Sequence, residues 1–181
     1  CTHCTAPPHH WGKHPEPPHD GGRERDLYDG EVHYTDLYVG KLLSWAAEQP
    51  WWDKTAVIIS ADHGEAFGEH GMMQHAHELY EELVRVPLLV RVPGVEPRRI
   101  STPHTHLDLA PTILELMGQE ALAGFAGESL VAELDGKPGK AKPIVLELAA
   151  DNVQPARRAV VDGDWKLIRF GDPITLVDEF E

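Results

Sequence analysis

The chain has 181 residues, a length that suits one domain with a small appendage. Apolar residues make up 41% of it, which is enough for a core, but no apolar run is long enough to predict a membrane span. The net charge of -14, with no cluster of Lys and Arg, argues against nucleic acid or an anionic membrane surface as a partner. Cys1 and Cys4 lack the second pair that a structural zinc site requires.

The first part of the chain divides into an irregular segment and a helix. Residues 1–25 are rich in proline and histidine without any period, which predicts an irregular segment, and residues 26–181 form the expected domain. Apolar side chains recur at helical spacing over residues 27–49 and predict an amphipathic helix. Asp26 is its expected N-cap and Pro50 its expected stop.

Two strands are expected next. A β-branched run over residues 55–60 predicts a buried strand of the parallel type. Residues 84–92 predict a second strand, interrupted by Pro87. A short helix is expected between the two strands, at residues 77–83.

The second half predicts one more helix and a hairpin. Asp108 is the expected cap of a helix over residues 108–117, with Gly118 as its stop. Three further strands are expected, at residues 144–148, 158–161 and 164–170. Asp162-Gly163 is a strong two-residue hairpin signal. Strands and helices thus alternate before a hairpin, which predicts an α/β fold whose sheet gains antiparallel strands late.

The loop after the first strand carries the chemistry. Asp62 and His63 leave the strand side by side, and a carboxylate and an imidazole at a strand end can both turn toward one cation. Three more histidines follow, at His70, His75 and His77. Glu65 and Glu69 are candidate acceptors that would orient His63 and His70.

The order of several short motifs resembles the sulfatases of the alkaline phosphatase superfamily. The matching motifs are Asp62-His63-Gly64-Glu65, Phe67-Gly68-Glu69-His70-Gly71, Leu79-Tyr80-Glu81-Glu82, Val84-Arg85-Val86-Pro87-Leu88, Asp108-Leu109-Ala110-Pro111-Thr112 and Trp165-Lys166-Leu167-Ile168. The resemblance implies an alkaline-phosphatase-like mixed sheet flanked by helices, with a late antiparallel hairpin. It makes residues 26–181 the carboxyl-terminal part of a sulfatase-like domain.

The resemblance also implies roles for the loop residues. It makes Asp62 a ligand of one divalent metal ion, and His63 the counterpart of a residue that is often asparagine. Calcium is the favoured ion, while the imidazole nitrogen also tolerates manganese or zinc. Sulfatases have a lysine that contacts the sulfate, and His75 or His77 stands in its place, depending on the end from which the loop is counted. With His70, these histidines are the catalytic candidates.

The nucleophile motif of the family is missing. Sulfatases carry a Cys or Ser that is oxidised to formylglycine, in a Cys/Ser-x-Pro-x-Arg motif. The nearest match, Cys4-Thr5-Ala6-Pro7-Pro8, has alanine and proline where proline and arginine are required. We therefore expect a carboxyl-terminal fragment of an enzyme that acts on small-molecule or glycan sulfate esters, inactive alone. Formylglycine is expected only upstream. The family is often periplasmic or secreted, and no signal segment is visible here.

Two alternatives remain open from the sequence. Within the superfamily, the chain could come from a phosphodiesterase, a phosphonate hydrolase or a phosphoethanolamine transferase. A formylglycine context of the nucleophile would indicate a sulfatase, and a plain threonine would indicate phosphotransfer. The alternative of another class is a non-catalytic domain that binds a metal or a partner.

Overall fold

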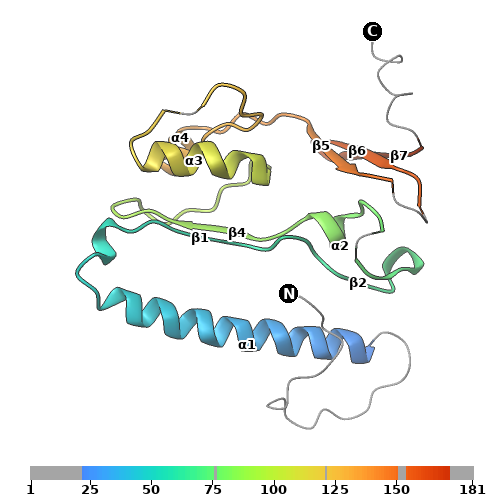
Figure 1. Ribbon diagram of the computed structural model, residues 1–181, viewed down its shortest axis with the longest axis horizontal. Coiled ribbons are helices and arrows are strands. Elements are labelled where there is room, and N and C mark those ends of the chain that lie inside the picture. Colours follow the sequence, from blue (N-terminus) through green and yellow to red (C-terminus); the bar gives the residue numbers. More distant parts are fainter. Residues whose placement is uncertain (1–21, 76, 121, 151–153, 172–181) are drawn as a thin grey trace. The chain divides into compact units, whose positions relative to one another are not determined.

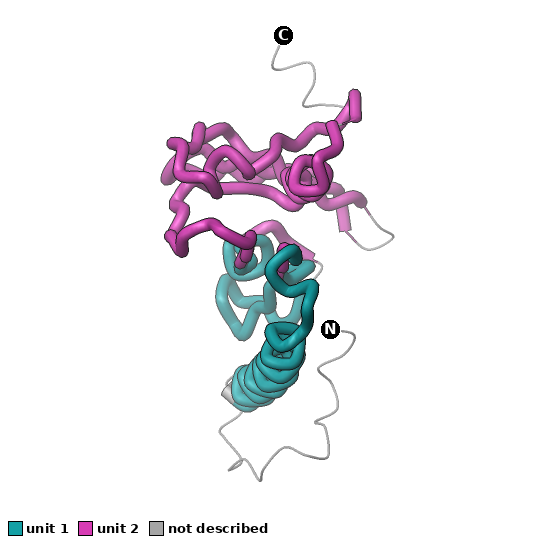
Figure 2. Tube along the Cα trace, turned by 90° about the vertical axis from the view of Figure 1, so that its left-hand side faces the viewer, with its two compact units in different colours: residues 1–55, 60–76, 81–87 teal, residues 56–59, 77–80, 88–181 magenta. Residues whose placement is uncertain are grey.

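The computed structural model describes residues 22–75, 77–120, 122–150 and 154–171 (Figure 1). The predicted irregular segment, apart from its last residues, and the cysteine pair lie outside these ranges. The chain forms two compact units (Figure 2). Unit 1 comprises residues 1–55, 60–76 and 81–87, and unit 2 comprises residues 56–59, 77–80 and 88–181.

Unit 1 begins with a long helix, α1 (Gly22–Ala47), followed by the short helix η1 (Trp52–Lys54). The predicted N-cap is wrong, because Asp26 lies inside α1. The helix starts earlier since the residues before Asp26, from Arg23 to Arg25, are good helix formers with no breaker among them. It ends before Pro50, as expected.

A small antiparallel hairpin completes the part of unit 1 that positions the loop. It consists of β2 (Ala66–Phe67) and β3 (Met73–Gln74), joined through η2 (Glu69–Gly71). The Phe67 ring packs edge-on against Tyr28 of α1, with ring centres 5.2 Å apart. Ala66 is fully buried.

The predicted helix at 77–83 is much shorter in the structure. It is reduced to α2 (Glu81–Val84), in which Leu83 is buried. Leu79 is also buried, but it belongs to unit 2. The chain therefore leaves unit 2 and enters unit 1 within the range where one continuous helix was expected.

The two expected strands are neighbours, as predicted. They are β1 (Val57–Ser60) and β4 (Leu88–Arg91), and they form a two-stranded sheet. The second strand is shorter than predicted and starts after Pro87, which has no N–H to give to a sheet. Asp62 lies two residues after Ser60, the carboxyl end of β1, as expected.

Unit 2 also contains the expected helix with a different start. A short helix, η3 (His106–Asp108), leads into α3 (Leu109–Leu116), and α4 (Val131–Leu134) follows later. Asp108 is wrong as a side-chain cap of α3, because its carboxylate instead accepts the backbone N–H of Thr105. Gly118 has a φ of +70°, which suits its predicted place after the helix.

The late hairpin is confirmed. Three antiparallel strands, β5 (Ile144–Leu148), β6 (Arg157–Asp162) and β7 (Trp165–Phe170), form a sheet of their own and do not extend β1 and β4. The turn is Gly163-Asp164, one residue later than predicted, with Gly163 at a φ of +56°. No helix in the described ranges is long and apolar enough to cross a membrane.

Candidate functional site

Asp62 and His63 lie close together at the end of β1. The Oδ2 atom of Asp62 is 3.7 Å from Nε2 of His63, and its Oδ1 accepts the backbone N–H of His63 at 3.1 Å. Both side chains reach solvent, with exposed fractions of 71% and 37%. A cation about 2.0–2.6 Å from each ligand atom fits between donors at this separation.

The protonation of the pair also suits a cation. Nδ1 of His63 lies 2.8 Å from the carbonyl oxygen of Gly64, which can only accept, so Nδ1 carries the proton and Nε2 presents its lone pair. Hydrogen bonds from its own backbone N–H and from that of His63 hold the pKa of Asp62 below its ordinary value. Within the described ranges, no third His, Cys, Asp or Glu completes a metal-binding group.

His75 joins this pair through the β2–β3 hairpin. Its ring stacks on the His63 ring, with centres 4.2 Å apart and planes 28° apart. Its Nδ1 lies 3.0 Å from Oε2 of Glu65. The structure therefore brings Asp62, His63 and His75 together within unit 1.

His70 lies in the same loop and has a different partner. Its Nδ1 is 2.8 Å from Oε1 of Glu82, in α2, and its backbone has a φ of +54°. The expectation that Glu65 orients His63 and that Glu69 orients His70 is wrong. Glu69 instead accepts the backbone N–H of Phe67 at 2.6 Å, because the tight turn of η2 folds its side chain back onto β2.

His77 belongs to unit 2. Its Nδ1 lies 2.9 Å from Nε2 of Gln154. The next residue, Glu78, pairs with the largely buried Arg157 at the start of β6, with Oε2 and Nε 2.8 Å apart. These contacts tie the segment after the loop to the β5–β7 sheet of unit 2.

Gly64 lets the loop pass close to α2. Its N–H donates to the carbonyl of Leu83 at 2.8 Å, and a Cβ at this position would overlap the carbonyl oxygen of Glu82. Because that oxygen belongs to the backbone, Gly64→Ala is expected to destabilise unit 1 by about 1–3 kcal/mol, measured by chemical denaturation. Gly40→Ala is the control, since a Cβ there meets nothing within 4 Å in α1 and is expected to stabilise by about 0.5–1 kcal/mol. Equal effects would contradict the close approach.

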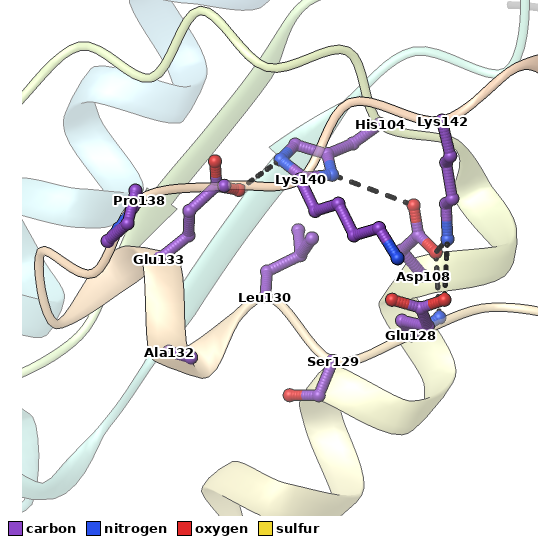
Figure 3. Close-up of a pocket in the computed structure, with 11 residues that line it drawn as sticks. His104, Asp108, Glu128, Ser129, Leu130, Ala132, Glu133, Pro138, Lys140 and Lys142 are labelled. Atoms are coloured by element: carbon purple, nitrogen blue, oxygen red, sulfur yellow. Dashed lines mark hydrogen bonds and ion pairs between the residues drawn. The ribbon is translucent and has the colours of Figure 1, made fainter.

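A second polar cluster surrounds Asp108 in unit 2, next to a pocket of about 170 Å³ (Figure 3). Asp108 is only 1% exposed. Its Oδ2 accepts the N–H of Thr105 at 3.0 Å, and its Oδ1 accepts the N–H of Glu128 at 2.8 Å. Lys142 Nζ lies 3.3 Å from Oδ1. The carboxylate thus ties the start of α3 to the 128–142 segment.

His104 stands between two acids in the same cluster. Its Nδ1 lies 3.7 Å from Oδ2 of Asp108, and its Nε2 lies 2.5 Å from Oε2 of Glu133, close but not aligned as a hydrogen bond (Figure 3). The charges of this cluster are paired with one another, which is the pattern of a structural network. We therefore assign the Asp108 cluster a role in the stability of unit 2.

The Asp108 cluster predicts a pH dependence. Burial alone would raise the pKa of Asp108, but the hydrogen bonds from Thr105 and Glu128 and the charge of Lys142 hold that pKa below its ordinary value. Its stabilising effect is therefore present above about pH 4 and is lost as the pH falls through the folded-state pKa. Asp108→Asn is expected to be about 1–3 kcal/mol less stable at neutral pH and to lose less stability on acidification.

Denaturation at several pH values would measure this effect. Glu115→Gln is the control, because that exposed acid of α3 takes no part in the Asp108 cluster. It should keep the wild-type slope of unfolding free energy against pH. An unchanged slope in Asp108→Asn would remove Asp108 as the cause.

Two family models match overlapping parts of the chain. The family model described as Sulfatase matches residues 3–119, and the model described as N-sulphoglucosamine sulphohydrolase, C-terminal, matches residues 68–181. The choline-sulfatase of Rhizobium meliloti (strain 1021) is 31% identical over 160 residues, which are 86% of this chain and 31% of that protein. Arylsulfatase K of Gallus gallus is 27% identical over 163 residues, 85% of this chain and 30% of that protein. The chain thus spans about a third of the length of these curated relatives.

Solved structures show the same fold. A phosphonate monoester hydrolase from Silicibacter pomeroyi has a TM-score of 0.74 at 26% identity, covering 81% of this chain and 32% of that one. A protein solved in complex with its substrate D-glucosamine-2-N,6-O-disulfate has a TM-score of 0.65 at 25% identity, covering 77% and 30%. The expected alkaline-phosphatase-like fold class is confirmed. Because the Sulfatase model matches more than half of the chain, the chain belongs to the sulfatase family.

Proposed function

We propose that this chain supplies a metal-binding pair and a substrate-facing histidine to an enzyme that hydrolyses sulfate esters. One observation carries the proposal. The Asp62–His63 pair and the His75 ring lie together in unit 1, with the two imidazoles stacked at 4.2 Å. A cation site beside a group that can carry a proton or a positive charge suits the cleavage of an anionic ester.

Asp62 and His63 would hold one divalent cation. Support comes from the open Nε2 of His63 and its 3.7 Å separation from the Asp62 carboxylate. Two ligands are half of a site or less, so the remaining ligands would come from outside the described residues. Calcium is favoured by the carboxylate, and manganese or zinc is tolerated by the imidazole. When bound, the ion supplies Lewis-acid stabilisation of negative charge on the ester oxygens.

His75 is the proposed counterpart of the sulfate-contacting lysine. It would bind a sulfate oxygen or protonate the leaving alcohol. Its contact with the His63 ring supports it over His77, whose Nδ1 faces Gln154 in unit 2. His70 stays a second candidate, with its Nδ1 held by Glu82.

The nucleophile would lie outside this chain. No Ser, Thr or Cys here stands in the family motif, and the chain spans about a third of its curated relatives. We use the term extended protein for this chain joined to a nucleophile-bearing sulfatase segment. The chain alone would position an ester without attacking it.

A sulfated sugar is the proposed substrate class. The matched family model is described as a sulphoglucosamine sulphohydrolase, and several relatives are named as sugar sulfatases, among them an N-acetylglucosamine-6-O-sulfatase. A structural neighbour binds a glucosamine disulfate. A phosphonate monoester as substrate is the alternative, favoured by the likeness to the hydrolase from Silicibacter pomeroyi.

The nucleophile distinguishes these functions. Mass spectrometry of the extended protein should find formylglycine at the nucleophile position, and the protein should prefer nitrophenyl sulfate to bis-nitrophenyl phosphate. A plain threonine with a preference for the phosphate ester would replace the sulfatase proposal by phosphotransfer. Metal binding with no turnover of either ester would support a non-catalytic domain.

A further inference from the structure

We propose that Glu65 is the positioning residue of His75, fixing its ring orientation and its tautomer so that Nε2 is the atom offered to the ester. The proposal rests on the sulfatase function stated above. It concerns a contact that spans ten positions of the sequence and brings a carboxylate within 3.0 Å of the ring.

The register of the small hairpin creates the contact. Ala66 pairs with Gln74, and Phe67 pairs with Met73, in the antiparallel ladder of β2 and β3. Glu65 directly precedes this ladder and His75 directly follows it, so the ladder holds both residues at the same end of the hairpin. The φ of +69° at Gln74 turns the backbone just before His75, and Nδ1 of His75 then lies 3.0 Å from Oε2 of Glu65.

The Glu65 carboxylate pairs with the His75 ring. Its side chain is only 10% exposed, whereas that of His75 is 40% exposed. Its Oε2 lies 3.0 Å from Nδ1 of His75, and its Oε1 has no hydrogen-bond partner among the described residues. A buried carboxylate requires a partner, and here that partner is the imidazole.

The contact defines which nitrogen faces outward. An ionised carboxylate only accepts hydrogen bonds, so Nδ1 of His75 carries the proton that it donates to Glu65. The stacked ring of His63 restrains the plane of the same imidazole. With Nδ1 and one face occupied, Nε2 on the far edge of the ring is left for the substrate. A second proton taken up by the ring is then held on Nε2, where it can be donated to a sulfate oxygen or to the leaving alcohol. Groups that orient a functional histidine in this way typically contribute 10- to 100-fold to activity.

The tautomer of His75 tests the inference on the 181-residue chain itself. Long-range ¹H–¹⁵N correlation spectra, recorded where the ring is neutral, should show His75 as the Nδ1–H tautomer in the wild type. The spectrum of His75→Gln identifies the signal. Glu65→Ala should shift it toward the Nε2–H tautomer, and Glu65→Gln, whose amide oxygen can still accept, should keep it. A wild-type His75 in the Nε2–H form would overturn the inference without any variant.

Glu82 provides a matched control. It makes the same kind of contact with His70, at 2.8 Å, and does not contact His75. Glu82→Ala should change the spectrum of His70 and leave His75 unchanged. If Glu65→Ala leaves the tautomer of His75 as in the wild type, the positioning role is wrong.

The activity of the extended protein separates this inference from the proposed function. Normalised to folded protein, Glu65→Ala should lower kcat by about 10- to 100-fold with little change in KM, and Glu65→Gln should restore most of it. Equal losses in both variants would contradict positioning through a hydrogen bond. An extended protein with no sulfatase activity but with His75 as the Nδ1–H tautomer would instead contradict the function and leave the contact in place.

Discussion

Replacement of His75 by alanine in the extended protein is expected to lower kcat for nitrophenyl sulfate by about 10²-fold or more. This is the scale of a lost acid–base or charge-stabilising group. The physical reason is the place of the ring, which stacks on His63 beside the proposed metal pair and leaves Nε2 for the ester. Steady-state kinetics with the wild type and the variant would measure the loss.

His77→Ala is the matched control for that prediction. His77 is two positions further along the chain, and its Nδ1 faces Gln154 in the other unit. Its replacement should change kcat much less. Small and equal effects from both variants would mean that neither histidine takes the place of the lysine, and a large loss only in His77→Ala would reverse the assignment.

Asp62→Ala is expected to abolish metal-dependent turnover in the extended protein, because it removes an anionic ligand next to His63. We expect calorimetry to detect weak binding of calcium, manganese or zinc to the 181-residue chain, and the same change should remove that binding. Binding should be weak since an open two-ligand site leaves most of the coordination to water.

The exposed acid Glu81 supplies the control for Asp62, because Glu81→Ala removes one negative charge elsewhere in unit 1. It should change calorimetric binding little. Tight binding that survives Asp62→Ala would remove Asp62 from the metal site. Equal losses in the two variants would show a nonspecific effect of charge.

The candidate metal pair could be predicted because its information is local. Asp62 and His63 are adjacent in sequence and follow a β-branched run, and a strand end places neighbouring side chains near one edge. The same locality made the late hairpin predictable from Asp162-Gly163, although the turn lies one residue further on. The structure places Asp62 and His63 together after β1 and forms the hairpin, while metal binding by the pair stays a prediction.

The partners of the loop histidines could not be predicted in the same way. Strands β2 and β3 have two residues each, too few to show an alternating pattern, and their register decides which glutamate meets His75. Counting along the motif from its two ends gave His75 and His77 and favoured His75 only slightly, because the two counts disagree by the length of one insertion. The contact of His75 with Glu65 depends on the tertiary structure, as does the contact of His70 with Glu82.

The start of the second helix shows the same limit. An aspartate before an apolar run usually caps the helix that follows. Asp108 instead bonds to Thr105 behind it and to Glu128 and Lys142 far along the chain. The spacing Thr105-x-x-Asp108 is that of a capping box, which the structure forms. The distances in sequence to Glu128 and Lys142 carry no signal of contact, so that part of the buried network was visible only in the structure.

We propose that this chain holds a metal pair and a substrate-facing histidine, and that the nucleophile lies outside it. The most direct test is an assay of nitrophenyl sulfate and bis-nitrophenyl phosphate with calcium, manganese and zinc, on the purified 181-residue chain and on the extended protein. We expect turnover of the sulfate ester only by the extended protein, because covalent catalysis requires an activated nucleophile held next to the metal. Metal-dependent turnover by the 181-residue chain, abolished by Asp62→Ala, would instead show that this chain carries its own nucleophile.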